Sequence, residues 1–377
     1  MESSVKNYEN NSLLTSEERI KLSLRSLYKL YGYLPYKMSK FEEYDLYVRN
    51  KDFLVSNRFI TFNDTDGKLL ALKPDITLSI ISNGTDEADC KQKVFYDEKV
   101  YRISESTGHF KELTQLGLEC IGSVDAYDLY EVISLAACSL SMISNSYVLE
   151  ISHLGILATL LQTACPDAGK QQKALRYIEQ KNAHDLEQLC KNQGAAQEDI
   201  DALLLLVSSY GKREDVLNVL RKIPNVCNTG AFKELEQLSA LLDGCEQSSN
   251  ILFDFSVVND MAYYNGLVFR GFIDGAFDSV LAGGQYDNLM QKMNRNSKAI
   301  GFAIYVDMLE RLSGVAPQYD VDVLLLYGED ESASKIAELV GSYIASGKTV
   351  SAQKSIPAKL RYKELVDLTS KGGDAQC

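Results

Sequence analysis

Residues 253–269, FDFSVVNDMAYYNGLVF, constrain the fold of this chain more than any other stretch. The first five residues alternate apolar and polar side chains, which predicts a β-strand. After a polar break come two adjacent tyrosines, an Asn-Gly pair at 265–266 and a second apolar run. Asn-Gly between two apolar runs is a strong short-range hairpin signal. The sequence therefore predicts two strands joined by a tight turn in this region.

The paired tyrosines, Tyr263 and Tyr264, allow two interpretations. A buried pair presents flat apolar walls with a hydroxyl at each tip, which suits a small ligand that has both a ring and polar groups. The same pair can also serve only to pack the sheet. This stretch on its own favours packing.

The bulk composition indicates a water-soluble protein. The chain has 377 residues, enough for one large domain and a smaller one, and its hydrophobic content of 45% is ordinary. A net charge of −13 argues against a broad surface for nucleic acid. The first residues are polar and lack the apolar core of a signal peptide. No apolar run approaches membrane-spanning length, the nearest being 202–207, so we expect a cytoplasmic protein that does not contact membranes.

Metal and cofactor chemistry have no support in the sequence. The eight cysteines are scattered without a CxxC pair, and the three histidines, at 109, 153 and 184, lack metal-ligand spacing. We expect reduced thiols, no bound metal and no cofactor.

A pair of predicted strands carries polar residues on an otherwise apolar background. Residues 99–104 and 112–121 form the pair, and period-2 alternation places Gln115, Gly117 and Glu119 on one face of the second strand. A buried amide and carboxylate need hydrogen-bond donors. Those donors can come from a ligand ammonium group or from Arg102 on the neighbouring strand, and the residues alone leave both alternatives open.

A second polar cluster follows two strands predicted at 59–62 and 68–72. Pro74 suits the first position of a helix, with Asp75 and Thr77 in its first turn. Asp75 can stabilise the helix start through the macrodipole, or it can project a carboxylate into a cleft at the strand-to-helix junction.

The remaining pattern predicts an α+β fold. A capping box at 15–18 starts an amphipathic helix, and a further helix and strand follow at 126–141 and 147–151. Strand patterns then stop, which indicates a helical insertion at about 166–247. We expect a main domain at 1–318 and a small C-terminal α/β module at 319–377. Other predicted features are a glycine-rich turn at 282–287, a strand at 300–305, a helix through 312, and in the module a strand at 321–327, a helix at 333–345, a strand at 349–352 and a solvated basic tail at 354–371.

Several of these segments together resemble class II histidyl-tRNA synthetases and their non-catalytic paralogue, the regulatory subunit of ATP phosphoribosyltransferase. The resemblance covers about residues 15 to 312. The segments that carry it, in the order of the family, are LKPDIT at 72–77, KVYRIS at 99–104, ELTQLGLECIG at 112–122, YYNGLVF at 263–269, GGQYDNL at 283–289 and IGFAI at 300–304. It implies a class II synthetase-like antiparallel sheet of six strands flanked by helices.

The resemblance also implies a pocket for free histidine. Asp75, Gln115 and Glu119 would hold the ammonium and nearby polar atoms, and Tyr263 and Tyr264 would line the imidazole. Thr77 and Arg102 would border the carboxylate side.

The departures from the synthetase pattern fall on the ATP half of the site. Asn259 stands where synthetases carry the arginine of R-G-L-D, and Leu113 replaces a phenylalanine that stacks on adenine. Tyr305 and Met308 replace a glycine and an arginine of motif 3, with Arg311 one turn further on. Losing these cations removes the electrostatic stabilisation that adenylation requires.

The resemblance therefore implies a regulatory subunit without catalytic residues of its own. We expect it to bind a short-form ATP phosphoribosyltransferase catalytic subunit, to be required for its activity in the first step of histidine biosynthesis, and to carry feedback inhibition by histidine. It also implies a dimer within a larger hetero-oligomer, and we do not expect tRNA binding, because the C-terminal module is short and the chain is acidic. The alternative is a divergent histidyl-tRNA synthetase that ligates histidine to tRNA with ATP.

Overall fold

The computed structural model describes residues 14–51, 54, 58–84, 91–104, 107–258, 263–310 and 319–369. The chain divides into two compact units. The larger is Thr15–Leu312, and the smaller combines Met1–Leu14 with Ser313–Cys377.

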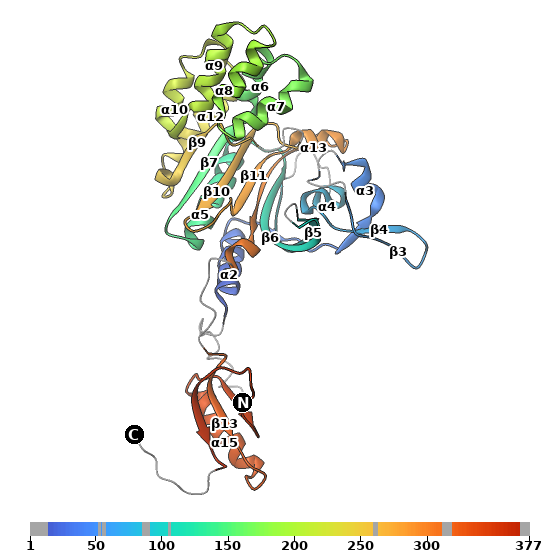
Figure 1. Cartoon of the computed structure of the whole chain (residues 1–377), viewed down its shortest axis with the longest axis vertical. Helices are drawn as coiled ribbons and strands as arrows, with labels where there is room; N and C mark the ends of the chain where they lie inside the picture. Colours follow the sequence, from blue (N-terminus) through green and yellow to red (C-terminus); the bar gives the residue numbers. More distant parts are fainter. Residues whose placement is uncertain are drawn as a thin grey trace. The chain divides into compact units, whose positions relative to one another are not determined.

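The larger unit is built on a nine-stranded mixed sheet (Figure 1). Six consecutive strands, from β5 to β7 in sheet order, pair in antiparallel fashion, as the synthetase-like resemblance implies. At the two sides, β1 pairs with β5 and β9 pairs with β7 in parallel. In sheet order the strands are β1 (Leu34–Pro35), β5 (Gln92–Ile103), β6 (Phe110–Gly122), β12 (Lys298–Tyr305), β11 (Leu281–Gln285), β10 (Leu267–Ile273), β7 (Tyr147–His153), β9 (Ile251–Asp254) and β8 (Tyr210–Lys212).

Helix α5 (Ala126–Ile143) covers one face of this sheet together with α2 (Ser16–Leu30). The capping box predicted at the start of α2 is present, since the Thr15 and Glu18 side chains bond each other's backbone amides. Side chains Leu116, Leu118 and Cys120 of β6 join the core beneath α5. Because strands alternate, Gln115 and Glu119 face the opposite side of the sheet, as the sequence predicted.

Helix α5 is the one described helix that is long and apolar enough to cross a membrane by length and composition. The prediction that 202–207 comes nearest to membrane-spanning length is therefore wrong. Within the fold it is a core helix, because 61% of its most apolar window is buried. Its two buried carboxylates, Asp128 and Glu131, pair with Lys91 at 2.7 Å and Lys93 at 2.6 Å.

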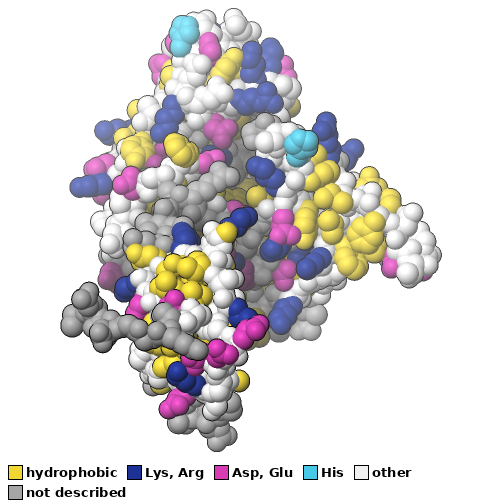
Figure 2. Space-filling view, turned by 60° about the horizontal axis from the view of Figure 1, so that its bottom comes forward, with side chains coloured by type: hydrophobic (Ala, Val, Ile, Leu, Met, Phe, Trp, Pro, Cys, Tyr) yellow, Lys and Arg dark blue, Asp and Glu magenta, His cyan; other side chains and the backbone are white. Residues whose placement is uncertain are grey.

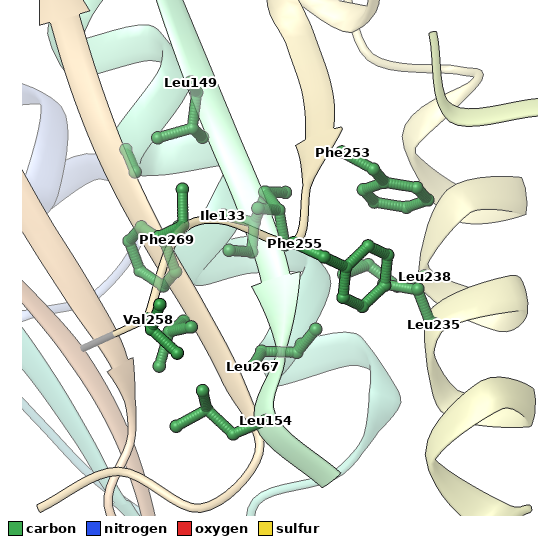
Figure 3. Packing of buried hydrophobic residues seen from close by; sticks show 14 of the residues in the cluster. Ile133, Leu149, Leu154, Leu235, Leu238, Phe253, Phe255, Val258, Leu267 and Phe269 are labelled. Carbon is green, nitrogen blue, oxygen red and sulfur yellow. The ribbon is translucent and has the colours of Figure 1, made fainter. Parts of the chain in front are cut away.

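The predicted hairpin at 253–269 is wrong. Strands β9 and β10 both pair with β7, which lies between them. Residues 255–258 and 263–266 belong to the connection between them, and Asn265 binds β11 and α13 (Asp287–Lys292) through its backbone N–H and its side-chain oxygen. The Asn-Gly pair does not form a hairpin turn, because β7, which precedes the helical insertion in sequence, lies between β9 and β10. Phe253 and Phe255 instead point toward Leu235 and Leu238 of the insertion (Figure 3).

The glycine-rich turn predicted at 282–287 is also wrong, because Leu281–Gln285 is strand β11 in the middle of the sheet. The glycines serve close approach. A Cβ on Gly284 would lie 2.7 Å from both the Leu267 carbonyl oxygen and the Tyr264 ring. A side chain in this place would therefore displace a tyrosine of the candidate site.

The helical insertion lies beyond one end of the sheet (Figure 1). Arg213 fixes its base: the guanidinium is buried and binds Asp243, Ser248 and the Ile251 carbonyl oxygen. The helices of this region are α6 (Leu154–Ala164), α7 (Ala168–Glu179), α8 (Ala183–Lys191), α9 (Gln197–Ser208), α10 (Arg213–Leu220), α11 (Pro224–Cys227) and α12 (Gly230–Leu242), followed by the short turn η2 (Ser248–Asn250).

A small three-stranded sheet stands beside the main one, in the order β2 (Phe41–Glu43), β4 (Leu69–Leu72), β3 (Thr61–Asn63), with α3 (Tyr44–Arg49) next to it. Phe41 and Phe62 contact each other edge to face at 5.3 Å and remain exposed. Figure 2 shows hydrophobic side chains gathered on this part of the surface. The predicted pair of strands and the turn at 64–67 are confirmed.

The C-terminal unit contains a parallel sheet in the order β14 (Val350–Gln353), β13 (Val321–Leu326), β15 (Tyr362–Asp367), with α15 (Ala333–Ala345). The predicted strand, helix and strand are present. Strand β15 lies inside the segment predicted as a basic tail, so part of that segment belongs to the sheet. Residues 311–318, next to the predicted domain boundary, lie outside the described residues.

Candidate functional site

One cavity of about 700 Å³ opens on the face of the main sheet opposite α5. All seven predicted site residues line this cavity, although they come from four separate segments. They are Asp75, Thr77, Arg102, Gln115, Glu119, Tyr263 and Tyr264.

Glu119 lies at the centre of the cavity's polar floor. Its side chain is 2% exposed and accepts hydrogen bonds from the Tyr286 hydroxyl at 2.6 Å and the Thr77 hydroxyl at 2.8 Å. The Tyr96 hydroxyl donates a third, longer bond of 3.5 Å. These donors orient both carboxyl oxygens without supplying a positive charge.

Burial therefore dominates the titration of Glu119 and raises its pKa to about 8, against the opposing effect of the hydroxyl donors, while nearby Asp75 adds to the rise. This carboxyl is therefore mostly protonated near neutral pH. A ligand cation placed against it would favour the ionised form. Gly301 on β12 makes room for this group, since a Cβ there would overlap the Glu119 carboxylate.

Asp75 does not lie within the helix, as its predicted place after Pro74 implied. It is the N-cap of α4 (Ile76–Asn83), where its side chain accepts a hydrogen bond from the Leu78 amide at 2.9 Å. Its other oxygen accepts a hydrogen bond from Nη2 of Arg102 at 3.3 Å, and Nε of Arg102 donates one to the Pro74 carbonyl oxygen at 2.6 Å. Capping and facing the cleft, which the sequence left as alternatives, are thus combined in one side chain.

Three tyrosine rings form an aromatic wall of the cavity. The Tyr263 ring lies 4.6 Å from Tyr264 and 5.9 Å from Tyr286, centroid to centroid. Burial raises the pKa of all three hydroxyls well above the usual value, so each keeps its proton and can donate a hydrogen bond.

The cavity lining includes residues that depart from the synthetase pattern. They are Leu113, Tyr305 and Met308. Lys73, in the LKPDIT segment that carries the resemblance, is fully buried and pairs with Glu98 at 3.2 Å. Asn259 and Arg311 lie outside the described residues.

Tyr286, Tyr96 and Arg270 line the cavity and were not foreseen as site residues. Tyr286 belongs to the GGQYDNL segment, which was noted for its glycines and for the family resemblance. Tyr96 lies opposite Gly117 on β5, where the missing side chain leaves space for its ring. Arg270 reaches the cavity from β10. Period-2 alternation on β5 could have indicated Tyr96, whereas Arg270 had no local signal.

Among the residues described, no group of three or more His, Cys, Asp and Glu side chains is arranged to hold a metal ion. The six cysteines that are described are free thiols. His153 lies at the end of β7 and contacts Glu234 of α12 at 3.1 Å, away from the cavity lining.

Comparison with known proteins gives the family. The profile of the histidyl-tRNA synthetase family matches residues 12–309. A protein of Clostridium kluyveri named ATP phosphoribosyltransferase regulatory subunit is 30% identical over 337 residues, which cover 81% of each chain. A protein of the same name from Caldanaerobacter subterraneus is 28% identical and covers 84% of each chain.

Solved structures share the fold. An ATP phosphoribosyltransferase regulatory subunit/histidyl-tRNA synthetase from Bacillus halodurans superposes with a TM-score of 0.74 at 23% identity, covering 93% of each chain. Histidyl-tRNA synthetase from Nostoc gives a TM-score of 0.71 at 16% identity, covering 91% of this chain and 84% of that one. A chain of an ATP phosphoribosyl transferase complex from Thermotoga maritima gives 0.61 at 20% identity and covers 78% and 98%. This chain therefore belongs to the histidyl-tRNA synthetase-like family, in the group of ATP phosphoribosyltransferase regulatory subunits.

Proposed function

We propose that this chain is the histidine-sensing regulatory subunit of a cytoplasmic ATP phosphoribosyltransferase. It binds free histidine in the cavity above the sheet, associates with a short-form catalytic subunit that requires it for activity, and transmits feedback inhibition by histidine. The observation that carries the proposal is Glu119, a buried carboxyl held by hydroxyl donors and placed beside a wall of tyrosine rings.

The chemistry of the cavity fits an amino acid with an aromatic side chain. The ammonium group would lie against Asp75, Gln115 and Glu119, because carboxylates and an amide oxygen supply the acceptors that a cation needs. The imidazole would contact the tyrosine rings Tyr263 and Tyr264, whose hydroxyls remain protonated. Thr77 and Arg102 would border the ligand carboxylate.

The chain has no aminoacylation activity of its own under this proposal. The cavity lining offers Leu113, Tyr305 and Met308, which are a poor match for the adenine ring and the phosphates of ATP. An ATP–pyrophosphate exchange assay with histidine tests this statement directly. Robust exchange would favour the alternative function, a divergent histidyl-tRNA synthetase.

Association with a catalytic subunit is supported by the name that the relatives carry, and tRNA binding is not part of the proposal. Self-association as a dimer is supported by exposed apolar residues at the end of α2 and in β1. Leu30 is 84% exposed, Tyr31 is 40% exposed and Leu34 is 68% exposed. Analytical ultracentrifugation would detect the dimer, and a monomer at micromolar concentration would contradict it.

Isothermal titration calorimetry tests the histidine site. The wild type should bind histidine, and Glu119→Ala should abolish binding or weaken it by at least tenfold. Glu112→Ala removes an exposed carboxylate from the same strand and serves as the matched control. Equal binding by wild type and Glu119→Ala would refute the assignment of the pocket.

A further inference from the structure

A zwitterionic amino acid in this cavity needs a cation for its carboxylate, and the cavity offers two. Among the described lining residues, the cations are Arg102 and Arg270. Arg102 is already engaged by the Pro74 carbonyl oxygen and by Asp75, the same carboxylate that would face the ligand ammonium. The synthetase-like arginine is absent from the sequence, because its position is Asn259. Arg270 is therefore the cation of the lining to which the proposed function assigns no role.

The register of the sheet directs Arg270 toward the ligand. Arg270 on β10 pairs with Ala282, which pairs with Ala303, which pairs with Gly117, and paired residues share a face of the sheet. Arg270 is thus three strand spacings of roughly 4.8 Å away from Gly117, the residue between Gln115 and Glu119. The two residues between them, Ala282 and Ala303, have small side chains and form the floor of the cavity here. This floor leaves space for a ligand the size of an amino acid between the acidic end and Arg270.

Tyr305 shows that the two arginines approach the same part of the cavity. Burial raises the pKa of its hydroxyl, and the positive charges of Arg102 and Arg270 both oppose that rise. A carboxylate near this hydroxyl would lie within the field of both guanidinium groups.

Carboxylates of the protein already surround Arg270. Its Nη2 lies 3.0 Å from Oε1 of Glu179 at the end of α7, a side chain that is 47% exposed. Glu150 is its register partner on β7, and Asp278 lies on the rim of the cavity. A partly exposed ion pair such as Arg270–Glu179 contributes little stability, so a ligand carboxylate inside the cavity can compete for the guanidinium.

We propose that Arg270 binds the carboxylate of the amino-acid effector, in exchange for its ion pair with Glu179. This inference rests on the proposed function, since it assumes that an amino acid enters the cavity. Its consequence is a connection between the ligand and the helical insertion. When the ligand carboxylate takes Arg270, the end of α7 loses its bond to β10.

The test compares histidine with histidinol, which has a hydroxymethyl group in place of the carboxylate, on the full-length protein by calorimetry. The wild type should prefer histidine, and Arg270→Gln should reduce the ratio of the two affinities about tenfold or more while histidinol binding stays within twofold. Glu179→Gln should raise the ratio by roughly two- to fivefold, because the competing carboxylate is gone. Arg221→Gln, which removes an arginine with two surface partners on the insertion, should leave the ratio unchanged.

Three results would overturn the inference. In the first, Arg270→Gln keeps the wild-type ratio. In the second, it weakens both ligands equally, which indicates a structural role. In the third, Glu179→Gln lowers the ratio, as expected if the ion pair only supports the fold. If the wild type binds neither ligand, the proposed function fails first and the inference falls with it, so the two failures are distinguishable.

Discussion

Replacing Glu119 by glutamine should change how stability depends on pH. The pKa of this carboxyl is about 8 in the folded chain, against a reference value of 4.5, because the group is buried. Between these two values the folded state holds a proton that the unfolded state releases. Stability therefore falls as pH rises through this window. Glutamine keeps the shape and cannot ionise.

The magnitude follows from the shift. Each pH unit in which one extra proton is bound corresponds to about 1.36 kcal/mol. Over pH 6 to 8 the wild type should lose about 2 kcal/mol of unfolding free energy relative to Glu119→Gln, allowing for partial ionisation near pH 8. This range also keeps the protein above its pI of about 4.9, where net charge vanishes.

Urea denaturation followed by tyrosine fluorescence is the assay, since the chain has 22 tyrosines and no tryptophan. Glu112→Gln is the control, because Lys99 holds the pKa of that exposed carboxyl low and it is ionised throughout the range. Its difference from wild type should be independent of pH. A Glu119→Gln difference that is equally flat would refute the reasoning.

Three further predictions concern the ligand, the cavity and the insertion. Histidine binding at pH 7 should release up to about 0.9 proton from Glu119. Calorimetry in buffers of different ionisation enthalpy measures this release, and an equal release by Glu119→Gln would contradict the prediction. Gly301→Ala should destabilise by about 1–3 kcal/mol in urea, whereas Gly341→Ala in α15 meets no atom within 4 Å and should stabilise by about 1 kcal/mol. Arg213→Ala should cost about 2 kcal/mol or more, because the buried Ser239 hydroxyl and Ile251 carbonyl oxygen lose this donor, and Arg221→Ala should cost under about 1 kcal/mol. Similar costs would refute the buried role of Arg213.

Local periodicity predicted the polar face of β6 correctly. The positions of Gln115 and Glu119 follow from alternation within a single strand, and the capping box of α2 follows from four adjacent residues. Such features depend on neighbours in sequence, which the residues themselves specify. Periodicity could not predict that separate segments meet in one site. The resemblance to the synthetases predicted it.

Long-range pairing explains the failures. The Asn-Gly signal at 265–266 predicted a hairpin, but β7, more than a hundred residues earlier, occupies the place between β9 and β10. The glycines of β11 are there because neighbouring atoms pack closely against the strand. In the sequence, the same glycines are typical of a turn. Arg270 reaches the cavity through the register of β10 and meets Glu179 from the insertion, and neither relation is encoded locally.

Reconstitution with a short-form catalytic subunit tests the central claim most directly. Phosphoribosyltransferase activity would be measured against histidine concentration with wild type, Glu119→Ala and the control Glu112→Ala, each normalised to its own activity without histidine. The expected result is that the wild type and Glu112→Ala confer activity and inhibition by histidine, while Glu119→Ala loses the inhibition. Inhibition that is equally strong with Glu119→Ala, or a wild type that confers no activity, would contradict the claim.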